Sequence, residues 1–333
     1  MEIEALKQVL NSEAKYRLVQ SMQAVFKDLV SDWNEATVLP KELQEKLKKN
    51  CSLEIDSQIV VAKDGTTKAL INLADGKKVE VVLMRYRDER NTVCVSSQAG
   101  CPMGCLFCAT GKMGTGRNLT VGEMLDQVLL FARHLKKEAG EDGEVSNIVF
   151  MGMGEPFLNY DNVMEAIKIL NDPKGFALGI RYISISTCGI VDGINKFAEE
   201  NLQVNLAISL HAPNDKLRSK LMPINKQNPI NKVLEAVDNY IAKSSRKVMF
   251  EYLMLKGVND SSDLARELAS IMNKSLYMVN LIAYNATGDF EASPKETVDQ
   301  FSEILKKMGV AVTIRHSFGR EIKAACGQLA GGV

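Results

Sequence analysis

Residues 92–108 read TVCVSSQAGCPMGCLFC, which joins a short apolar pattern to three cysteines spaced C-x3-C-x2-C. The β-branched and apolar residues at its start predict a buried strand, and the small and polar residues that follow predict a loop. Three thiols this close can converge on one inorganic centre, because Gly104 lets the backbone wrap around it. The stretch therefore predicts a strand whose carboxyl end carries a metal or cluster site.

The same alternation continues along the chain, because short apolar strand patterns are each followed by an amphipathic helical pattern. The predicted strands are 92–96, 147–151, 181–186, 204–210, 247–255 and 278–283. The predicted helices are 121–137, 162–171, 193–200, 229–242, 262–273 and 294–308. Strand-helix units in such a row predict an α/β fold with a parallel sheet, in the form of a barrel or partial barrel, with a doubly wound sheet as the alternative.

Two further regions precede this alternation. Residues 1–50 have apolar positions at helical spacing and predict a small helical accessory domain, and residues 51–91 alternate with a period of two and predict a β-meander. We expect the barrel to span 92–316 and a C-terminal tail to span 317–333.

Composition removes several classes of protein. The chain has 333 residues, with 41 Lys plus Arg against 41 Asp plus Glu, so nucleic acid can bind only through local patches. With 46% hydrophobic and 25% charged residues it is an ordinary globular sequence. We expect a cytoplasmic protein that makes no membrane contact, since no apolar run is long enough to span a bilayer and MEIEALKQVL is not a secretory signal. In a reducing cytosol, 7 cysteines point to metal binding or catalysis before disulfides.

The cysteine run has two inorganic interpretations. A structural zinc site closes with four ligands, and the nearest histidine, His134, lies in a predicted helix away from the loop. A 4Fe-4S cluster held by Cys101, Cys105 and Cys108 leaves one iron open for a further ligand, so the sequence favours the cluster over zinc.

Polar residues gather where the predicted strands end. Gly154 and Glu155 follow the second strand in MGMGEP, where glycine permits close approach of a ligand and the carboxylate can accept hydrogen bonds from an ammonium group. Barrel active sites form on this face, although strand-end caps or satisfied core polar groups are the simpler alternative for each residue taken singly. The other candidates are Ser186, Ser209, Leu210, His211, Asn280 and Asn285.

The cysteine run at the end of a first barrel strand resembles the signature of the radical S-adenosylmethionine (SAM) superfamily, whose fold is a partial (β/α)6 barrel. The segments CVSSQAGC, MGMGEP, SLHAPND, LMPIN and ACGQL together resemble the RlmN/Cfr family of radical SAM adenosine methyltransferases. The resemblance runs from about residue 15 to the end of the chain. It implies a 4Fe-4S cluster and SAM as cofactors.

The resemblance also implies a mechanism that uses two SAM molecules per turnover in ping-pong order. One SAM methylates Cys326, and a second, bound to the cluster, yields a 5′-deoxyadenosyl radical that activates the S-methyl group for addition to adenine. Cys94 then releases the product by forming a disulfide with Cys326. Glu80 is the family-pattern match for a general base, with a solvated strand carboxylate as the equal alternative. Cys51 and Cys188 are left as packing residues.

The implied substrate is adenosine 2503 of 23S ribosomal RNA, and adenosine 37 of some transfer RNAs. Pro156 and the HAP of SLHAP favour methylation at carbon 2, whereas VTIRHSFG drifts toward the branch that methylates carbon 8 and confers antibiotic resistance. Family analogy gives a flavodoxin or ferredoxin as electron donor and a monomer as the oligomeric state. It also gives the N-terminal helices and meander a role in gripping the RNA.

The basic residues are unevenly distributed. The stretches 216–232 and 306–323 each hold five Lys or Arg with at most one acid, so they are candidate contacts to the RNA backbone. A zinc-stapled RNA-binding protein without catalysis is the alternative from another functional class.

Overall fold

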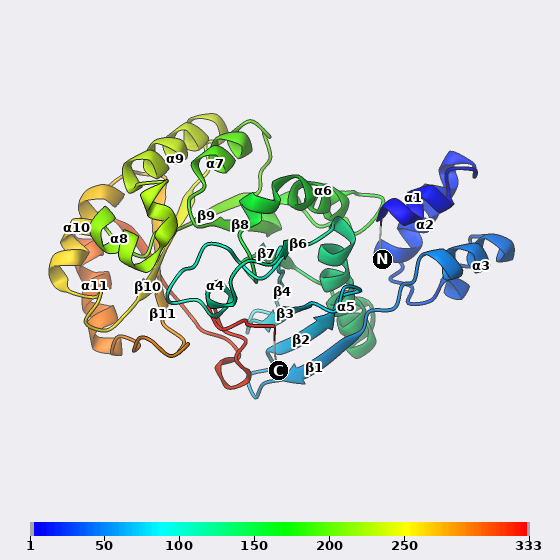
Figure 1. Ribbon diagram of the computed structural model, residues 1–333, viewed down its shortest axis with the longest axis horizontal. Helices are drawn as coiled ribbons and strands as arrows, with labels where there is room; N and C mark the ends of the chain where they lie inside the picture. The colour runs from blue at the N-terminus through cyan, green and yellow to red at the C-terminus, as the bar shows by residue number, and fades with distance from the viewer. Residues whose placement is uncertain (1–2, 332–333) are drawn as a thin grey trace.

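A ten-stranded sheet runs through the molecule in the order β1-β2-β3-β4-β7-β8-β9-β10-β11-β12 (Figure 1). The structure is a computed structural model and describes residues 3–331. The sheet strands are β1 Ser57–Val61, β2 Thr67–Asn72, β3 Lys78–Arg85, β4 Asn91–Cys94, β7 Asn147–Phe150, β8 Ile183–Thr187, β9 Asn205–Ser209, β10 Val248–Met254, β11 Tyr277–Ala283 and β12 Ala311–Arg315. A second small sheet pairs β5 Gln98–Ala99 with β6 Arg117–Asn118.

Helices join most of these strands. The α-helices are α1 Ile3–Val9, α2 Lys15–Phe26, α3 Lys41–Asn50, α4 Ala109–Met113, α5 Val121–Ala139, α6 Tyr160–Asn171, α7 Val191–Ala198, α8 Asp215–Leu221, α9 Ile230–Ser244, α10 Ser262–Met272 and α11 Lys295–Lys307. Short 3-10 helices are η1 Trp33–Glu35, η2 Gly140–Asp142, η3 Pro156–Asn159, η4 Ile180–Tyr182, η5 Pro223–Lys226 and η6 Arg320–Ile322.

The sheet combines two kinds of pairing. Strands β1 to β4 form an antiparallel meander, as the period of two predicts. From β4 through β12 every neighbouring pair is parallel, which is the α/β arrangement predicted from the strand-helix alternation. Within residues 3–331 the order begins at β1 and ends at β12, so the parallel strands form an open, partial barrel.

Two predictions of local structure are wrong. Residues 181–182, predicted as the start of a strand, lie in η4, and β8 begins at Ile183. The seventh parallel strand, β12, was not among the six predicted, because its side chains are mostly exposed and its sequence AVTIR lacks a long apolar run. The sequence therefore indicated the buried strands and missed the edge strand.

Helix α5 illustrates how the sequence fixes a helix boundary. Thr120 accepts a hydrogen bond from the Glu123 N–H, and the Glu123 side chain bonds back to the Thr120 N–H, which forms a capping box. Its buried face includes Leu125, Val128 and Leu129, which belong to the main hydrophobic core. Burial of each such side chain stabilises the fold by about 1.5–3 kcal/mol.

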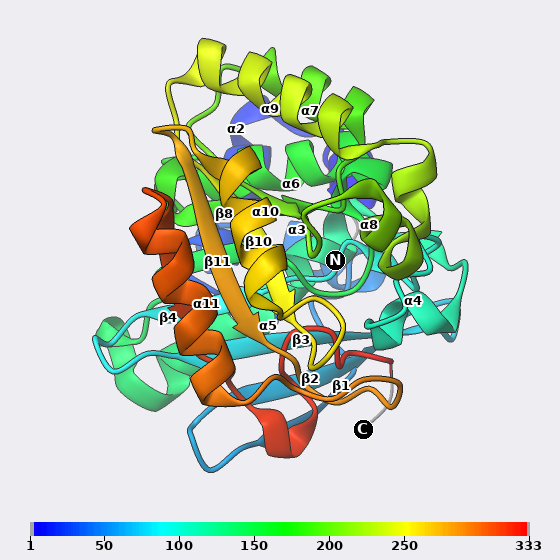
Figure 2. The same cartoon turned by 90° about the vertical axis from the view of Figure 1, so that its left-hand side faces the viewer.

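Figures 1 and 2 show how these parts are placed. Helices α1–α3 lie at one end of the molecule, and α8, α10 and α11 lie at the other. In both views the C-terminal tail, drawn in red, lies beside the β1–β3 part of the sheet. No helix among residues 3–331 is long and apolar enough to cross a membrane.

Candidate active site

Six of the chain's 7 cysteines line one cavity, and Cys188, expected as a packing residue, is one of them. Cys94 ends β4, and Cys101, Cys105 and Cys108 follow in the loop after it. Cys326 reaches the same cavity from the C-terminal tail. The fold thus brings together the three predicted cluster ligands and the two thiols that the resemblance assigns to turnover.

The loop after β4 is fixed to helix α5 before it reaches the cysteines. The Ser96 N–H donates to Gln127 Oε1 at 2.7 Å, and Gln127 Nε2 donates to the Ser96 carbonyl at 2.9 Å. Asn159 Nδ2 donates to the Ser97 carbonyl at 2.8 Å. Because buried amides satisfy these backbone groups, the loop leaves the sheet with a defined conformation.

The MGMGEP turn packs against this loop, and the packing explains its glycines. A Cβ on Gly152 would lie 2.7 Å from Ser96 Oγ, and one on Gly154 would lie 2.6 Å from Gln98 Cβ. The Glu155 N–H donates to Gln98 Oε1 at 2.8 Å. Any side chain at either glycine would therefore separate the turn from the loop that precedes the cysteines.

Glu155 lies buried at the wall of the cavity. Its Oε1 accepts from the Phe157 N–H at 3.0 Å, and its Oε2 accepts from the Cys188 N–H at 2.7 Å. Burial raises the pKa of Glu155, and these hydrogen bonds oppose the shift. The carboxylate is thus held rigidly, with acceptor capacity left for a ligand such as an ammonium group.

The three loop thiols fit a cluster better than a single metal ion. Burial raises the pKa of Cys101 to about 11, and the neighbouring Cys108 thiol adds to that shift. No set of three His, Cys, Asp or Glu side chains within residues 3–331 has the geometry of a metal-ion site. Zinc needs its thiolates at about 2.3 Å from one point, whereas each cysteine of a 4Fe-4S cluster binds a different iron.

Cys94 and Cys326 differ in their environments. Cys94 is buried, and this burial raises its pKa to about 12, with a further contribution from Cys326. Cys326 is an exposed residue that lines the cavity. Desolvation of its thiol raises the pKa of Cys326, and the Arg315 guanidinium opposes that shift. Arg315 also lowers the pKa of Cys94. One guanidinium therefore stabilises the thiolate forms of both cysteines.

The tail is docked at Cys326 and at the residue that follows it. Asn285 Nδ2 donates to the Cys326 carbonyl at 3.3 Å, and the Ala109 N–H donates to the Gly327 carbonyl at 2.7 Å. Glu80 receives the end of the tail and is 1% exposed, so the alternative of a solvated strand carboxylate is wrong. Among the described residues, Glu80 is outside the set that lines the cavity.

The remaining predicted residues divide into two groups. Ser186, Ser209 and His211 line the cavity along with Gly154 and Glu155. Leu210 packs in the hydrophobic core, and Asn280 bonds to Glu251 Oε1 at 3.0 Å. Glu251 was not among the predicted site residues, and Arg315 was included only in the candidate RNA-contact stretch 306–323; both line the cavity and form an ion pair at 3.3 Å. A charged residue inside the apolar run MFEYLM was the one signal for Glu251.

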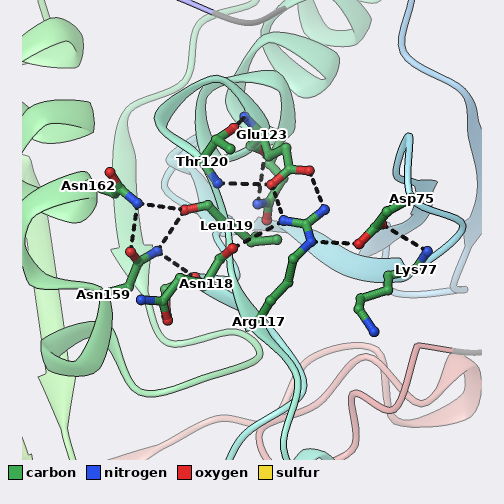
Figure 3. Close-up of polar contacts among 11 residues, drawn as sticks. Asp75, Lys77, Arg117, Asn118, Leu119, Thr120, Glu123, Asn159 and Asn162 are labelled. Carbon is green, nitrogen blue, oxygen red and sulfur yellow. Dashed lines mark hydrogen bonds and ion pairs between the residues drawn. The ribbon is translucent and has the colours of Figure 1, made fainter.

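A polar network ties the loop region to the meander (Figure 3). Arg117 donates through Nε to Asp75 Oδ2 at 2.7 Å and through Nη2 to Glu123 Oε1 at 2.6 Å. The Arg117 side chain therefore holds the turn between β2 and β3 against the start of α5, as the close-up shows. This contact links the small β5-β6 sheet to the meander of the main sheet.

One predicted RNA contact is wrong. Arg218, in the basic stretch 216–232, is completely buried, and its guanidinium donates to the carbonyls of Leu210 at 3.1 Å and Cys188 at 2.7 Å. It therefore braces strand ends and cannot meet phosphates. The exposed lysines of the same stretch, Lys216 among them, remain candidates.

The fold and the cysteine loop define a class of protein. Residues 95–268, which include all three loop cysteines and Glu155, match the sequence profile of the Radical SAM superfamily. A solved structure described as a radical SAM methyltransferase from Sphaerobacter thermophilus is 43% identical and covers 100% of this chain and 98% of its own, with a TM-score of 0.94.

Curated relatives narrow the class to a family. A probable dual-specificity RNA methyltransferase RlmN from Dictyoglomus thermophilum is 43% identical over 98% of this chain and 94% of its own length. A ribosomal RNA large subunit methyltransferase N from Nitrosopumilus maritimus is 46% identical over 95% of this chain and 92% of its own. The chain belongs to the RlmN family of radical SAM RNA methyltransferases.

Proposed function

We propose that this enzyme methylates carbon 2 of adenosine 2503 in 23S ribosomal RNA, and adenosine 37 of transfer RNA, through an S-methylcysteine at Cys326. The observation that carries the proposal is the single cavity shared by Cys94, Cys326 and the three loop thiols. The relatives' names include both ribosomal RNA and dual-specificity activity, which supports both substrates. A substrate in ribosomal RNA supports our proposal that the enzyme is cytoplasmic.

Cys101, Cys105 and Cys108 would hold a 4Fe-4S cluster, and Glu155 would hold the amino group of SAM. When bound, the cluster and SAM supply methyl groups and one-electron chemistry to the cavity. The candidate SAM contacts Ser186, Ser209 and His211 lie on the same wall, and the buried Asn285 Oδ1 accepts no hydrogen bond within residues 3–331. The donor set therefore fits a nucleoside cofactor.

Cys326 and Cys94 would carry the covalent part of the reaction. After the methylene carbon on the Cys326 sulfur has joined the adenine, the Cys94 thiolate attacks that sulfur and an S–S bond forms. The S–C bond breaks at the same time, and its electron pair stays on the methylene carbon, which takes a proton and becomes the methyl group. A cytosolic thiol then reduces the disulfide and restores both thiols.

The test combines two variants with analysis of the nucleosides produced. Cys326→Ala should abolish methyl transfer, and full methylation by this variant would contradict the assignment. Cys94→Ala should accumulate a protein-RNA crosslink on a denaturing gel. Cys51→Ala is the matched control, because Cys51 is buried against the N-terminal helices and outside the described cavity.

The position of the methyl group needs its own measurement. Mass analysis of RNA nucleosides should give 2-methyladenosine, with ribosomal and transfer RNA offered in parallel. A product of 8-methyladenosine would reassign the enzyme to the carbon 8 branch, toward which VTIRHSFG drifts.

The proposed function also involves an electron donor and RNA contacts outside the barrel. We propose a monomer that receives electrons from a flavodoxin or ferredoxin, with residues 1–50 and the meander helping to grip the RNA. The alternative of a zinc-stapled RNA-binding protein without catalysis is tested by anaerobic reconstitution with iron and sulfide. A cluster gives a brown protein with visible charge-transfer absorption, whereas a zinc protein stays colourless.

A further inference from the structure

A row of polar side chains crosses four neighbouring parallel strands, from the interior at β10 to the edge strand β12. The strand register places Ser209 of β9 beside Glu251 of β10, Glu251 beside Asn280 of β11, and Asn280 beside Thr313 of β12. Thr313 Oγ1 donates to Asn280 Oδ1, and Asn280 Nδ2 donates to Glu251 Oε1 at 3.0 Å. Each residue of the row from Thr313 to Asn280 therefore donates a hydrogen bond to its neighbour, and the last acceptor is Glu251.

Glu251 has one occupied and one unoccupied carboxylate oxygen. Its Oε1 accepts from Asn280 and, at 3.3 Å, from Arg315 Nη1. Its Oε2 is buried and accepts no hydrogen bond from any residue in the described range 3–331. Glu251 is 3% exposed and lines the cavity. Because a buried carboxylate oxygen without a donor is unfavourable, this oxygen is suited to a ligand that supplies one.

The cavity sets the chemistry of that ligand. Its lining includes Leu253 and Ile282 of the strands that carry Glu251 and Asn280, together with Val82, Met84 and Phe318. Apolar side chains around one acceptor suit a flat, neutral heterocycle with an N–H group, and a carboxylate repels phosphate. Adenine meets these conditions, because its exocyclic amino group is a donor on the Watson–Crick edge.

Two adenines could enter this cavity, that of SAM and that of the RNA, and position favours the RNA. Glu251 pairs with Arg315, whose Nη1 also contacts Met151 Sδ at 3.8 Å across the barrel. Both charges act on the Cys326 thiol, and Arg315 acts on Cys94 as well. Glu251 thus lies with Arg315 near the Cys326 thiol, which the proposed function assigns to the substrate base, whereas Glu155 accepts from the Cys188 N–H on the proposed cofactor side.

We propose that Glu251 recognises the substrate adenine by accepting a hydrogen bond at Oε2 from its exocyclic amino group. This inference rests on the proposed function, since it assigns a role in binding the RNA base. It also predicts selection against guanine and hypoxanthine, whose O6 would face the carboxylate and be repelled by it. In Glu251→Gln the amide can donate to O6, so the preference for adenine should fall.

The test measures how the holoenzyme binds RNA stem-loops with adenosine, purine riboside or inosine at the target position. Wild-type protein should bind adenosine RNA about tenfold or more tightly than either analogue, because one hydrogen bond to a charged acceptor is lost or opposed. Glu251→Gln should reduce both ratios to near one. Glu235→Gln, an exposed glutamate on α9, is the matched control and should keep the wild-type ratios.

Three outcomes would overturn the inference. The first is equal affinity of the wild-type protein for adenosine RNA and purine riboside RNA, which needs no variant. The others are a folded Glu251→Gln variant that keeps the wild-type affinity ratios, and a Glu251→Gln variant that loses SAM affinity but keeps its RNA affinity ratios. The last result would assign Oε2 to the adenosine of SAM. Nucleoside analysis of wild-type product runs in parallel, so absence of methyladenosine would count against the proposed function and leave the binding ratios to decide this inference.

Discussion

The Glu80 carboxylate accepts a hydrogen bond from the Ala330 N–H at 2.6 Å, although 250 positions separate the two residues. The same Oε2 accepts from the Gly331 N–H at 3.1 Å, and Oε1 pairs with Lys68 Nζ at 2.6 Å. A buried ion pair on the meander thus receives the end of the tail. Thr110 Oγ1 donates to the Leu329 carbonyl at 2.6 Å and reinforces this docking.

Replacing Glu80 should therefore loosen the tail that carries Cys326. Glu80→Gln removes the partner of a Lys68 that is 3% exposed, and loss of one member of a buried pair costs about 3–5 kcal/mol. We expect lower stability and faster hydrogen exchange at the Ala330 and Gly331 amides, measured by mass spectrometry. Glu54→Gln, at an exposed position, is the control. Unchanged exchange at both amides would show that the tail docks without Glu80.

Arg117 should contribute through geometry as well as charge. Lysine cannot reproduce the bidentate contact of Arg117 with Asp75 and Glu123, so Arg117→Lys should lower Tm by about 1.4 °C, the shift that a loss of about 1 kcal/mol gives in a chain of 333 residues. Arg117 is also the largest cause of the low pKa of Asp75, at about 2. The contribution of Asp75 is present above its unfolded pKa and is lost as the pH falls from about 4 toward 2.

An exposed arginine provides the control for Arg117→Lys. Arg87→Lys changes an exposed arginine on the turn between β3 and β4 and should leave Tm within about 0.7 °C of wild type. Differential scanning calorimetry at pH 7 measures both variants. Equal Tm values for the two would mean that the contact in Figure 3 does not stabilise the fold.

Cys94 should react slowly with alkylating reagents in the folded protein. Its pKa of about 12 leaves a thiolate fraction at pH 8 that is about a thousandfold below that of an ordinary thiol. Timed iodoacetamide labelling of the cluster-free chain, read by peptide mass spectrometry, should modify the exposed Cys326 before Cys94. Labelling of Cys94 should accelerate as the pH rises. If Cys94 and Cys326 react at the same rate, Cys94 is not a protected thiol.

The sequence predicted the parts of the fold whose signal is local. Apolar runs such as NIVF and NLAIS gave β7 and β9, and the period of two gave the meander. Strand β12 was missed because an edge strand needs few apolar residues. The loop cysteines, Gly154 and Glu155 were recognisable because they are close together in the chain, and the structure places them around one cavity.

Residues defined by long-range contacts were not predictable in the same way. Arg218 reads as a surface cation in a basic stretch, but four separate carbonyls from distant segments satisfy it in the interior. Glu251 gains its place from strand register, which pairs it with Asn280 and Ser209. Register depends on the whole sheet, so the polar row cannot be read from any one segment.

His211 should make stability depend on pH below neutrality. Burial is the main cause that lowers its pKa to about 3, and its Nδ1 accepts from the Leu253 N–H at 3.0 Å, which requires an unprotonated nitrogen. The unfolded chain binds a proton near pH 6.5 and the folded chain does not, so stability falls as the pH drops below about 6.5 and continues to fall toward 3. The slope attributable to His211 is about 1.4 kcal/mol per pH unit.

His211→Asn keeps an acceptor and tolerates the left-handed φ of 57°, so it should remove this slope between pH 6 and pH 5, as measured by urea unfolding. His316→Asn, at an exposed position, should retain the wild-type slope. A wild-type slope in His211→Asn would mean that His211 is already protonated in the folded protein.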